Sequence, residues 1–238
     1  IISYLFKNMN LDNFDNYKFS DKLSIQNINN LKKSQIKMTD MLREFNRICR
    51  KYNLKYWCDW GTLLGTIRYN KWIPYDSDID VSMFKEDYDI LKNIVQKELP
   101  NTMWFQDKNT DKYYKSDIGK IRYINSCYVD SPTQNWHNGL QLDIFIVKKI
   151  GNTIKGSANL MLWDKSTIFP LKESIFEDIL VYIPNKSNIV LKQYYGKNYL
   201  DEYPIDKRHP KTLKLDPDKP CEFAIKKYPN LYKSNPNQ

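Results

Sequence analysis

Apolar residues recur at helical spacing in three stretches of the chain. The longest stretch runs from Leu31 to Tyr52, and its opposite face carries Lys, Arg and Glu. A second runs from Lys85 to Leu99 and stops before Pro100. A third, from Ser187 to Tyr195, is closed by Gly196, a residue often found just after a helix. The pattern predicts a helix in each stretch.

Shorter segments alternate between apolar and polar residues or are rich in aromatics, which is typical of strands. The predicted strands are Leu54–Trp60, Asn101–Gln106, Ile118–Ile124, Ser126–Val129 and Leu140–Val147, and Lys172–Pro184 is predicted to form a hairpin. Residues 1–24 are expected to be an extended arm packed on the body or partly disordered. A helix is predicted around Asn159 to Trp163, and the tail from Asp201 is expected to be irregular.

Three aspartates, Asp76, Asp78 and Asp80, occupy alternating positions. Side chains alternate between the two faces of a strand, so we expect these carboxylates to share one face and Ile79, Val81 and Met83 to share the other. Adjacent carboxylates repel one another unless a cation lies between them, and Mg²⁺ takes carboxylate oxygens. The pattern therefore predicts a Mg²⁺ site that handles phosphate.

Three other interpretations of these aspartates are possible. A calcium-binding EF-hand loop needs Gly and Glu where this chain has Val81 and Asp87, so calcium is disfavoured. A sugar-nucleotide glycosyltransferase also uses an Asp-x-Asp metal clamp and stays open. A solvated acidic turn is disfavoured because the aspartates interleave with core-type residues.

Gly61 directly follows the predicted strand Leu54–Trp60 and opens a short predicted helix, Thr62 to Arg68, which contains Gly65. A strand, a glycine and a helix N-terminus together favour phosphate binding, because backbone N–H groups can approach an anion there. The glycine turn alone is a weak signal. Its position ahead of the aspartates makes the phosphate interpretation stronger.

Asp143 is a lone carboxylate in the apolar strand LQLDIFIV. A charge there needs a partner, which is either a nearby Lys or Arg or a metal shared with Asp78 and Asp80. We favour the metal. Lys120 and Arg122 are two residues apart and would share a strand face, where they either reach a phosphate or simply belong to a solvated edge strand.

Composition narrows the class of partner. The chain has 238 residues and a net charge of +9, but its lysines are spread along the sequence, so nucleic-acid binding is disfavoured. The four cysteines form no C-x-x-C pair, so free thiols are expected rather than zinc ligands, with one or two disulfides left open. No apolar run reaches the roughly 18 residues that span a bilayer, although an anchor upstream of Ile1 would be invisible.

Three blocks of sequence resemble the LicD/fukutin family. GTLLGTIRYNKWIPYDSDIDVSMF resembles the family pattern G-x-L-L-G-x-x-R followed by I-P-W-D-x-D-x-D, with Tyr75 in place of the usual Trp. GLQLDIFIV resembles a later strand of the family, although Val147-Lys148 replaces the usual Pro-Leu. FPLKESIFEDILVYIPNKSNIVLKQYYGKNYL resembles its C-terminal block, so the likeness covers about Lys37 to Leu200.

The resemblance implies an α+β fold, a nucleotidyltransferase-like mixed sheet flanked by helices with a C-terminal extension. It implies an N-terminal arm (1–30), a catalytic domain (31–200) and an irregular tail packed on that domain (201–238). Asp78, Asp80 and Asp143 would hold Mg²⁺, or Mn²⁺ in its place. Six residues would bind the donor's phosphates: Gly61, Thr62, Gly65, Arg68, Lys120 and Arg122. Of these, Lys120 and Arg122 are the weaker candidates.

The function implied is transfer of a phospho-alcohol, such as phosphocholine or an alditol phosphate, from a CDP-activated donor to a sugar hydroxyl of a glycan. The alternatives are a sugar-nucleotide-dependent glycosyltransferase and a non-catalytic member that binds a glycan or a partner enzyme. The expected partners are a CDP-activated donor and a glycan acceptor, without nucleic acid. The expected location is the cytoplasm, or the Golgi or ER lumen if an anchor precedes Ile1.

Overall fold

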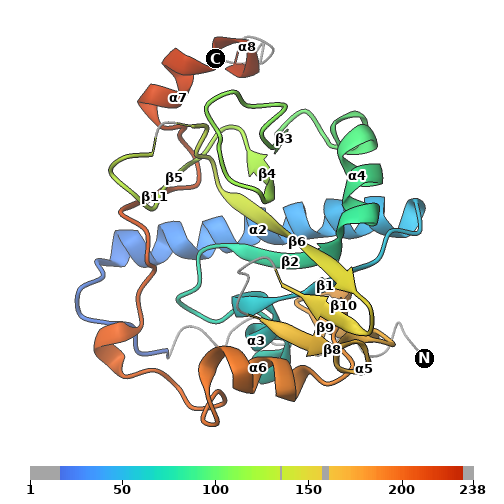
Figure 1. The fold of residues 1–238 in the computed structure, drawn as a ribbon. Helices are drawn as coiled ribbons and strands as arrows, with labels where there is room; N and C mark the ends of the chain where they lie inside the picture. Colours follow the sequence, from blue (N-terminus) through green and yellow to red (C-terminus); the bar gives the residue numbers. More distant parts are fainter. Residues whose placement is uncertain (1–16, 135, 157–160, 233–238) are drawn as a thin grey trace.

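The computed structural model describes residues 17–134, 136–156 and 161–232, and it confirms an α+β fold built on a mixed sheet flanked by helices (Figure 1). Five strands lie in the spatial order β1-β2-β6-β4-β3. Only β2 and β6 run parallel to each other; the remaining neighbours in this row are antiparallel. Their bounds are Tyr56–Cys58 for β1, Ile79–Phe84 for β2, Gln141–Ile150 for β6, Gly119–Tyr123 for β4 and Met103–Gln106 for β3.

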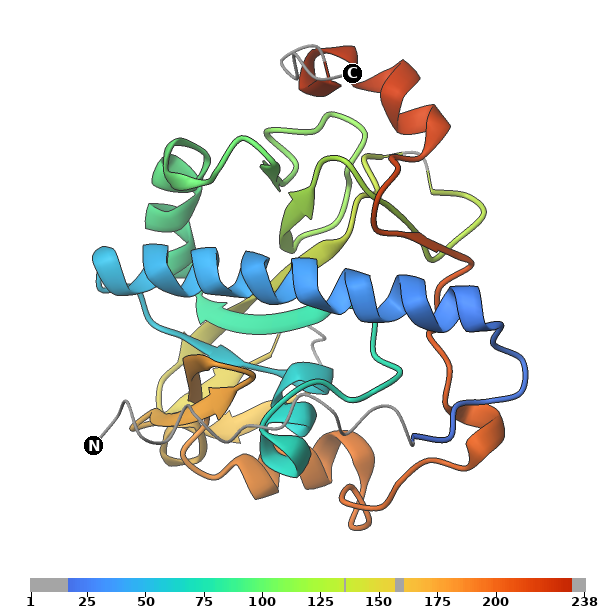
Figure 2. The same ribbon diagram turned by 180° about the vertical axis from the view of Figure 1, so that it is seen from behind.

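Helix α2 (Ile25–Lys51) crosses one face of this sheet (Figure 2). It begins at Ile25 rather than at Leu31, so residues 25–30, which the sequence assigned to an arm, are helical. The Ser24 hydroxyl caps the helix by accepting a hydrogen bond from the backbone N–H of Asn27. This N-terminal turn has mostly exposed side chains, and the apolar periodicity used for the prediction starts only at Leu31.

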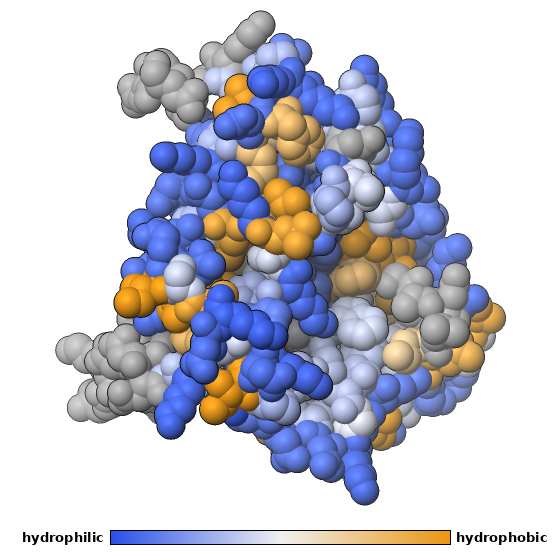
Figure 3. Space-filling view, turned by 90° about the vertical axis from the view of Figure 1, so that its left-hand side faces the viewer, coloured by the Kyte–Doolittle hydropathy of each residue, from blue (hydrophilic) through white to orange (hydrophobic). Residues whose placement is uncertain are grey.

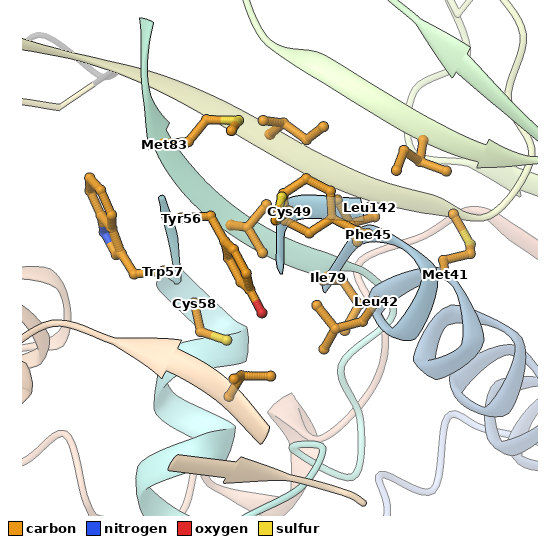
Figure 4. Close-up of a cluster of buried hydrophobic side chains, with 14 of the residues drawn as sticks. Met41, Leu42, Phe45, Cys49, Tyr56, Trp57, Cys58, Ile79, Met83 and Leu142 are labelled. Atoms are coloured by element: carbon orange, nitrogen blue, oxygen red, sulfur yellow. The ribbon is translucent and has the colours of Figure 1, made fainter. Parts of the chain in front are cut away.

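The main core lies between α2 and the sheet. Close packing there involves Leu42 and Phe45 of α2 with Ile79 and Met83 of β2, all without solvent exposure (Figure 4). The expected burial of Ile79, Val81 and Met83 on one side of β2 is therefore confirmed. A buried Phe or Leu contributes about 1.5–3 kcal/mol relative to an exposed one, so this interface holds the strand that carries Asp80.

Two further helices end near their predicted positions because their signals are local. Helix α4 (Lys85–Glu98) stops before Pro100, and α6 (Ser187–Tyr195) ends at Gly196, whose φ of 82° suits glycine. The predicted hairpin is confirmed as β9 (Lys172–Phe176) paired with β10 (Ile179–Ile183). Helix α3 (Trp60–Tyr69) connects β1 to the loop before β2. No helix within the described ranges is long and apolar enough to cross a membrane.

The segment after β6 differs from its prediction. Strand β6 continues to Ile150 and pairs with β7 (Thr153–Lys155), which pairs with β8 (Leu162–Asp164) before the short helix α5 (Lys165–Ile168). Part of the predicted helix around Asn159 to Trp163 lies outside the described residues, and Leu162–Asp164 is a strand, so the helix is wrong there. Pairing with β7, which a local pattern does not reveal, decides this conformation.

The tail is not irregular throughout, in contrast to the prediction. It contains a 3₁₀ turn (Ile205–Lys207), strand β11 (Lys214–Asp216), and helices α7 (Glu222–Lys227) and α8 (Pro229–Tyr232). Strand β11 pairs with β5 (Cys127–Val129). A disulfide between Cys127 and Cys221 attaches the start of α7 to β5, so the expectation of free thiols is wrong for this pair. Cys49 and Cys58 are free and buried.

Candidate metal and phosphate site

Three carboxylates converge where β2 and β6 begin. Asp80 in β2 and Asp143 in β6 are direct partners in the parallel register, and Asp78 immediately precedes β2. One oxygen from each of Asp78, Asp80 and Asp143 lies within 4.8 Å of the others. Three convergent carboxylates suit a hard divalent cation. The described residues therefore contain an acidic group able to bind a metal.

The third aspartate of the run, Asp76, stands outside this group. Strand β2 begins at Ile79, so Asp76 and Asp78 lie in the preceding loop, and the prediction that three carboxylates share one strand face is wrong. Asp76 Oδ1 accepts a hydrogen bond from Ser77 N at 3.0 Å. Its backbone N–H donates to the carbonyl of Ile73 at 2.9 Å, so Asp76 lies in a turn that precedes Asp78.

Burial and mutual repulsion make this acidic group costly without a cation. Burial first, and then the charges of Asp78 and Asp143, raise the pKa of Asp80 well above its usual value. Burial and Asp143 also raise the pKa of Asp78, while Lys120 and the Gln141 side chain oppose that rise. A divalent ion would remove the repulsion, so the electrostatics agree with the donor set.

Lys120 lies opposite Asp143 in the antiparallel register of β4 and β6. Its Nζ is 2.5 Å from Oδ1 and 2.7 Å from Oδ2 of Asp143, and the two side chains are 10% and 9% exposed. Asp143 thus has a lysine partner, as the salt-bridge interpretation predicts. It also lies beside Asp78 and Asp80, as the metal interpretation predicts. Strand β4 lies between β6 and β3, so the alternative of an edge strand is wrong.

Arg122 shares the face of Lys120, as predicted, but is fully buried. It donates from Nε to Gln106 Oε1 at 2.7 Å, and from Nη1 to Gln141 Oε1 at 2.7 Å and to the carbonyl of Gly139 at 2.9 Å. These partners enclose the guanidinium beneath the acidic group in this structure, and the contact of Arg122 with the donor's phosphates stays a prediction.

Both glycines of the predicted phosphate turn lie in close contact with neighbouring atoms. A Cβ on Gly61 would lie 2.3 Å from Asp76 Oδ2, and one on Gly65 would lie 2.6 Å from the carbonyl oxygen of Lys71. Thr62, between them, accepts a hydrogen bond from the backbone N–H of Asp80 at 2.8 Å. The first turn of α3 is thereby held directly against the strand that carries the acidic group.

Arg68, in the last turn of α3, pairs with the C-terminal segment of the chain. Its Nη2 pairs with Glu202 Oε1 at 3.1 Å, and its side chain is 4% exposed. It also lowers the pKa of Tyr75, although burial raises that pKa more. Arg68 therefore fastens the C-terminal segment to α3 in this structure, and its role in binding the donor's phosphates stays a prediction.

Sequence analysis missed Asp59, which lies between β1 and α3 and is 2% exposed. Its Oδ1 accepts from Trp60 N at 3.0 Å and from the Tyr194 hydroxyl at 2.8 Å, and its Oδ2 accepts from Ser82. Its own backbone N–H donates to the carbonyl of Asp80 at 3.0 Å. A single Asp inside the aromatic run YWCDW was the available signal for such a buried carboxylate.

Asp59 holds aromatic side chains in place beside the acidic group. The rings of Trp60 and Tyr194 stack with centroids 3.9 Å apart, and the ring of Phe145, two residues beyond Asp143, is 6.3 Å from that of Trp60. Trp60 has a φ of 40°, an uncommon conformation for a bulky residue. The site thus has a polar side, made by Lys120 and its partners, and an aromatic side.

Figure 3 shows the surface on the side where β2 begins. Strongly hydrophilic side chains surround paler, weakly polar ones near the centre of this face, and apolar patches lie between them.

The model of a known domain family matches this chain over residues 53–186, a range that includes the acidic group, α3 and the hairpin β9–β10. The class is a nucleotidyltransferase domain. The matching family is LicD/FKTN/FKRP, and because the match covers more than half of the chain, the protein belongs to it.

Curated relatives agree with this assignment. An uncharacterized protein of Rickettsia prowazekii is 29% identical over 181 residues, covering 73% of this chain and 58% of the relative. The lipopolysaccharide cholinephosphotransferase LicD of Haemophilus influenzae is 27% identical over 135 residues, covering 52% of this chain and 47% of the relative. The chain thus spans about half the length of these two relatives.

Proposed function

We propose that the protein is a metal-dependent phosphotransferase that moves a phospho-alcohol from a CDP-activated donor to a sugar hydroxyl of a glycan. The observation that carries the proposal is the convergence of Asp78, Asp80 and Asp143 within 4.8 Å beside the N-terminus of α3. The name of the Haemophilus relative, a lipopolysaccharide cholinephosphotransferase, supports transfer of this kind onto a glycan.

Asp78, Asp80 and Asp143 would hold Mg²⁺ or Mn²⁺, because both ions prefer carboxylate oxygens. When bound, such an ion neutralises phosphate charge and stabilises a leaving phosphate group. Thr62 and the backbone of Asp59 keep Asp80 in place through their hydrogen bonds to its main chain. Positioning of this kind matters because phosphoryl transfer depends mainly on geometry and charge neutralisation.

In the proposed reaction, the acceptor hydroxyl forms a bond to the phosphorus that carries the alcohol. The bond from that phosphorus to the bridging oxygen breaks, CMP leaves, and the hydroxyl proton is released. Lys120, already within hydrogen-bonding distance of Asp143, supplies a positive charge next to the phosphates. Gly61 and Thr62 in the first turn of α3 are the proposed backbone contacts to the donor.

The test is a screen of donors with mass spectrometry of the products. The purified protein would be incubated with a glycan acceptor, Mg²⁺ or Mn²⁺, and either CDP-choline, CDP-ribitol, a UDP-sugar or a GDP-sugar. The expected result is consumption of a CDP-alcohol and release of CMP, abolished by a chelator and by Asp80→Asn. Asp201→Asn, an exposed aspartate changed in the same way, is the matched control and should keep activity.

Turnover of a UDP- or GDP-sugar alone would replace the proposal with a glycosyltransferase. Binding of glycan without turnover of any donor, and without a metal requirement, would indicate a non-catalytic member of the family. Wild-type activity in Asp80→Asn would contradict the assignment of the acidic group as the reaction centre.

A further inference from the structure

A buried row of hydrogen bonds connects Asp78 to a second carboxylate, Asp111. Asp111 Oδ2 accepts from Gln106 Nε2 at 2.7 Å, and Gln106 Oε1 accepts from Arg122 Nε at 2.7 Å. On the other side of the guanidinium, Nη1 donates to Gln141 Oε1 at 2.7 Å, and Gln141 Nε2 donates to Asp78 Oδ2 at 3.3 Å. One buried cation is thus linked through two glutamines to two carboxylates.

The chemistry of the row determines which way each amide points. Arg and Lys side chains only donate hydrogen bonds, so the Gln141 atom that faces Arg122 and Lys120 has to be its oxygen. The NH₂ group of Gln141 then has to face Asp78, which only accepts while ionised. Neither amide can turn over without placing two donors, or two acceptors, against each other.

The burial of the row makes this orientation rigid. Gln106 and Arg122 are 0% exposed and Gln141 is 3% exposed, so water cannot replace a lost partner at low cost. The strand pairing also holds the parts in place, because Arg122 and Gln141 are register partners in β4 and β6. Asp78, in contrast, lies in a loop before β2, where backbone pairing does not hold it.

We propose that Gln141 is a positioning residue, which transmits the fixed orientation of Arg122 to the carboxylate of Asp78 and so sets that ligand for a divalent ion. The inference rests on the proposed metal site. It explains why a loop carboxylate can take part in a defined site, and why Arg122 is buried beneath the site. Partners of metal ligands typically change metal affinity by about 10- to 100-fold when they are removed.

The test measures Mn²⁺ affinity by isothermal titration calorimetry on folded, metal-free protein, without any donor. Gln141→Met keeps the size of the side chain and removes its three hydrogen bonds, to Arg122, Lys120 and Asp78, so the dissociation constant should rise about tenfold or more. Gln141→Asn keeps an amide but shortens its reach, so it cannot serve Arg122 and Asp78 together and should also weaken binding. Gln193→Met, an exposed glutamine changed in the same way, should leave the affinity unchanged.

A double-mutant cycle with Asp78→Asn separates positioning from a general structural effect. If Gln141 acts through Asp78, adding Gln141→Met to Asp78→Asn should weaken Mn²⁺ binding further by less than about twofold. Full additivity, or wild-type affinity in folded Gln141→Asn, would overturn the proposal. If wild-type protein binds no Mn²⁺, the proposed metal site itself is wrong, and Gln141 then has no metal ligand to position.

Discussion

Lys120 donates hydrogen bonds to both carboxylate oxygens of Asp143, at 2.5 and 2.7 Å, across the antiparallel strands β4 and β6. In the absence of a metal, its ammonium is paired directly with the acidic group. Burial lowers the pKa of Lys120, and Asp143 opposes that shift. The pair therefore balances charge in a place where neither partner is well solvated.

Removing Lys120 should destabilise the metal-free protein. Lys120→Met leaves Asp143 buried without its cation, and breaking a buried pair in this way costs about 3 kcal/mol. Urea denaturation without metal should show this loss, and Mn²⁺ should restore part of it. Lys85→Met, which removes an exposed i,i+4 pair with Asp89, should change stability by less than about 0.5 kcal/mol. Equal effects of the two variants would contradict the balancing role.

Asp78→Asn should raise the stability of the metal-free protein and abolish transfer activity. The change removes one of three mutually repelling carboxylates, so the metal-free protein should gain about 1 kcal/mol of stability, as is common at functional sites. Transfer activity should be lost, because Asn is a poor ligand for Mg²⁺ beside two carboxylates. Thermal melts without metal, paired with donor turnover, measure both effects. A less stable and fully active variant would be the contrary result.

The two glycines of α3 should respond differently to alanine. Gly65→Ala places a Cβ against the backbone of Lys71, which cannot move aside, so a loss of about 1–3 kcal/mol is expected. Gly61→Ala meets only the end of the Asp76 side chain, which can rotate, so stability should change by less than about 1 kcal/mol. Denaturant titrations of both variants make the comparison, and a greater loss in Gly61→Ala would refute this view of the packing.

The disulfide between Cys127 and Cys221 should contribute strongly to stability, because it joins residues 94 apart in the sequence. Closure of a loop of that length is worth about 4.7 kcal/mol in the chain-entropy model. A reductant should lower the urea midpoint of the wild-type protein and leave that of Cys221→Ser unchanged. If the reductant shifts both proteins equally, the stabilisation arises elsewhere.

Local patterns predicted much of the fold. The helices α4 and α6 and the hairpin β9–β10 follow from apolar spacing and from Pro100 and Gly196, which act within a few residues. The tail and β8 were not predicted, because short strands and helices there depend on pairing with β5 and β7 and on a disulfide. Conformations that distant partners stabilise leave little trace in a local window.

The sequence alone determined the chemistry of the site: alternating aspartates, a lone Asp143 in an apolar strand, and glycines where helix α3 packs closely. How these groups meet depends on the fold. The register that sets Asp80 opposite Asp143, and Asp143 opposite Lys120, depends on strands far apart in the sequence. A shift of one residue in this register would turn every side chain of the strand to the other face. Long-range pairing therefore places Lys120 beside the acidic group and Arg122 in the buried layer beneath it.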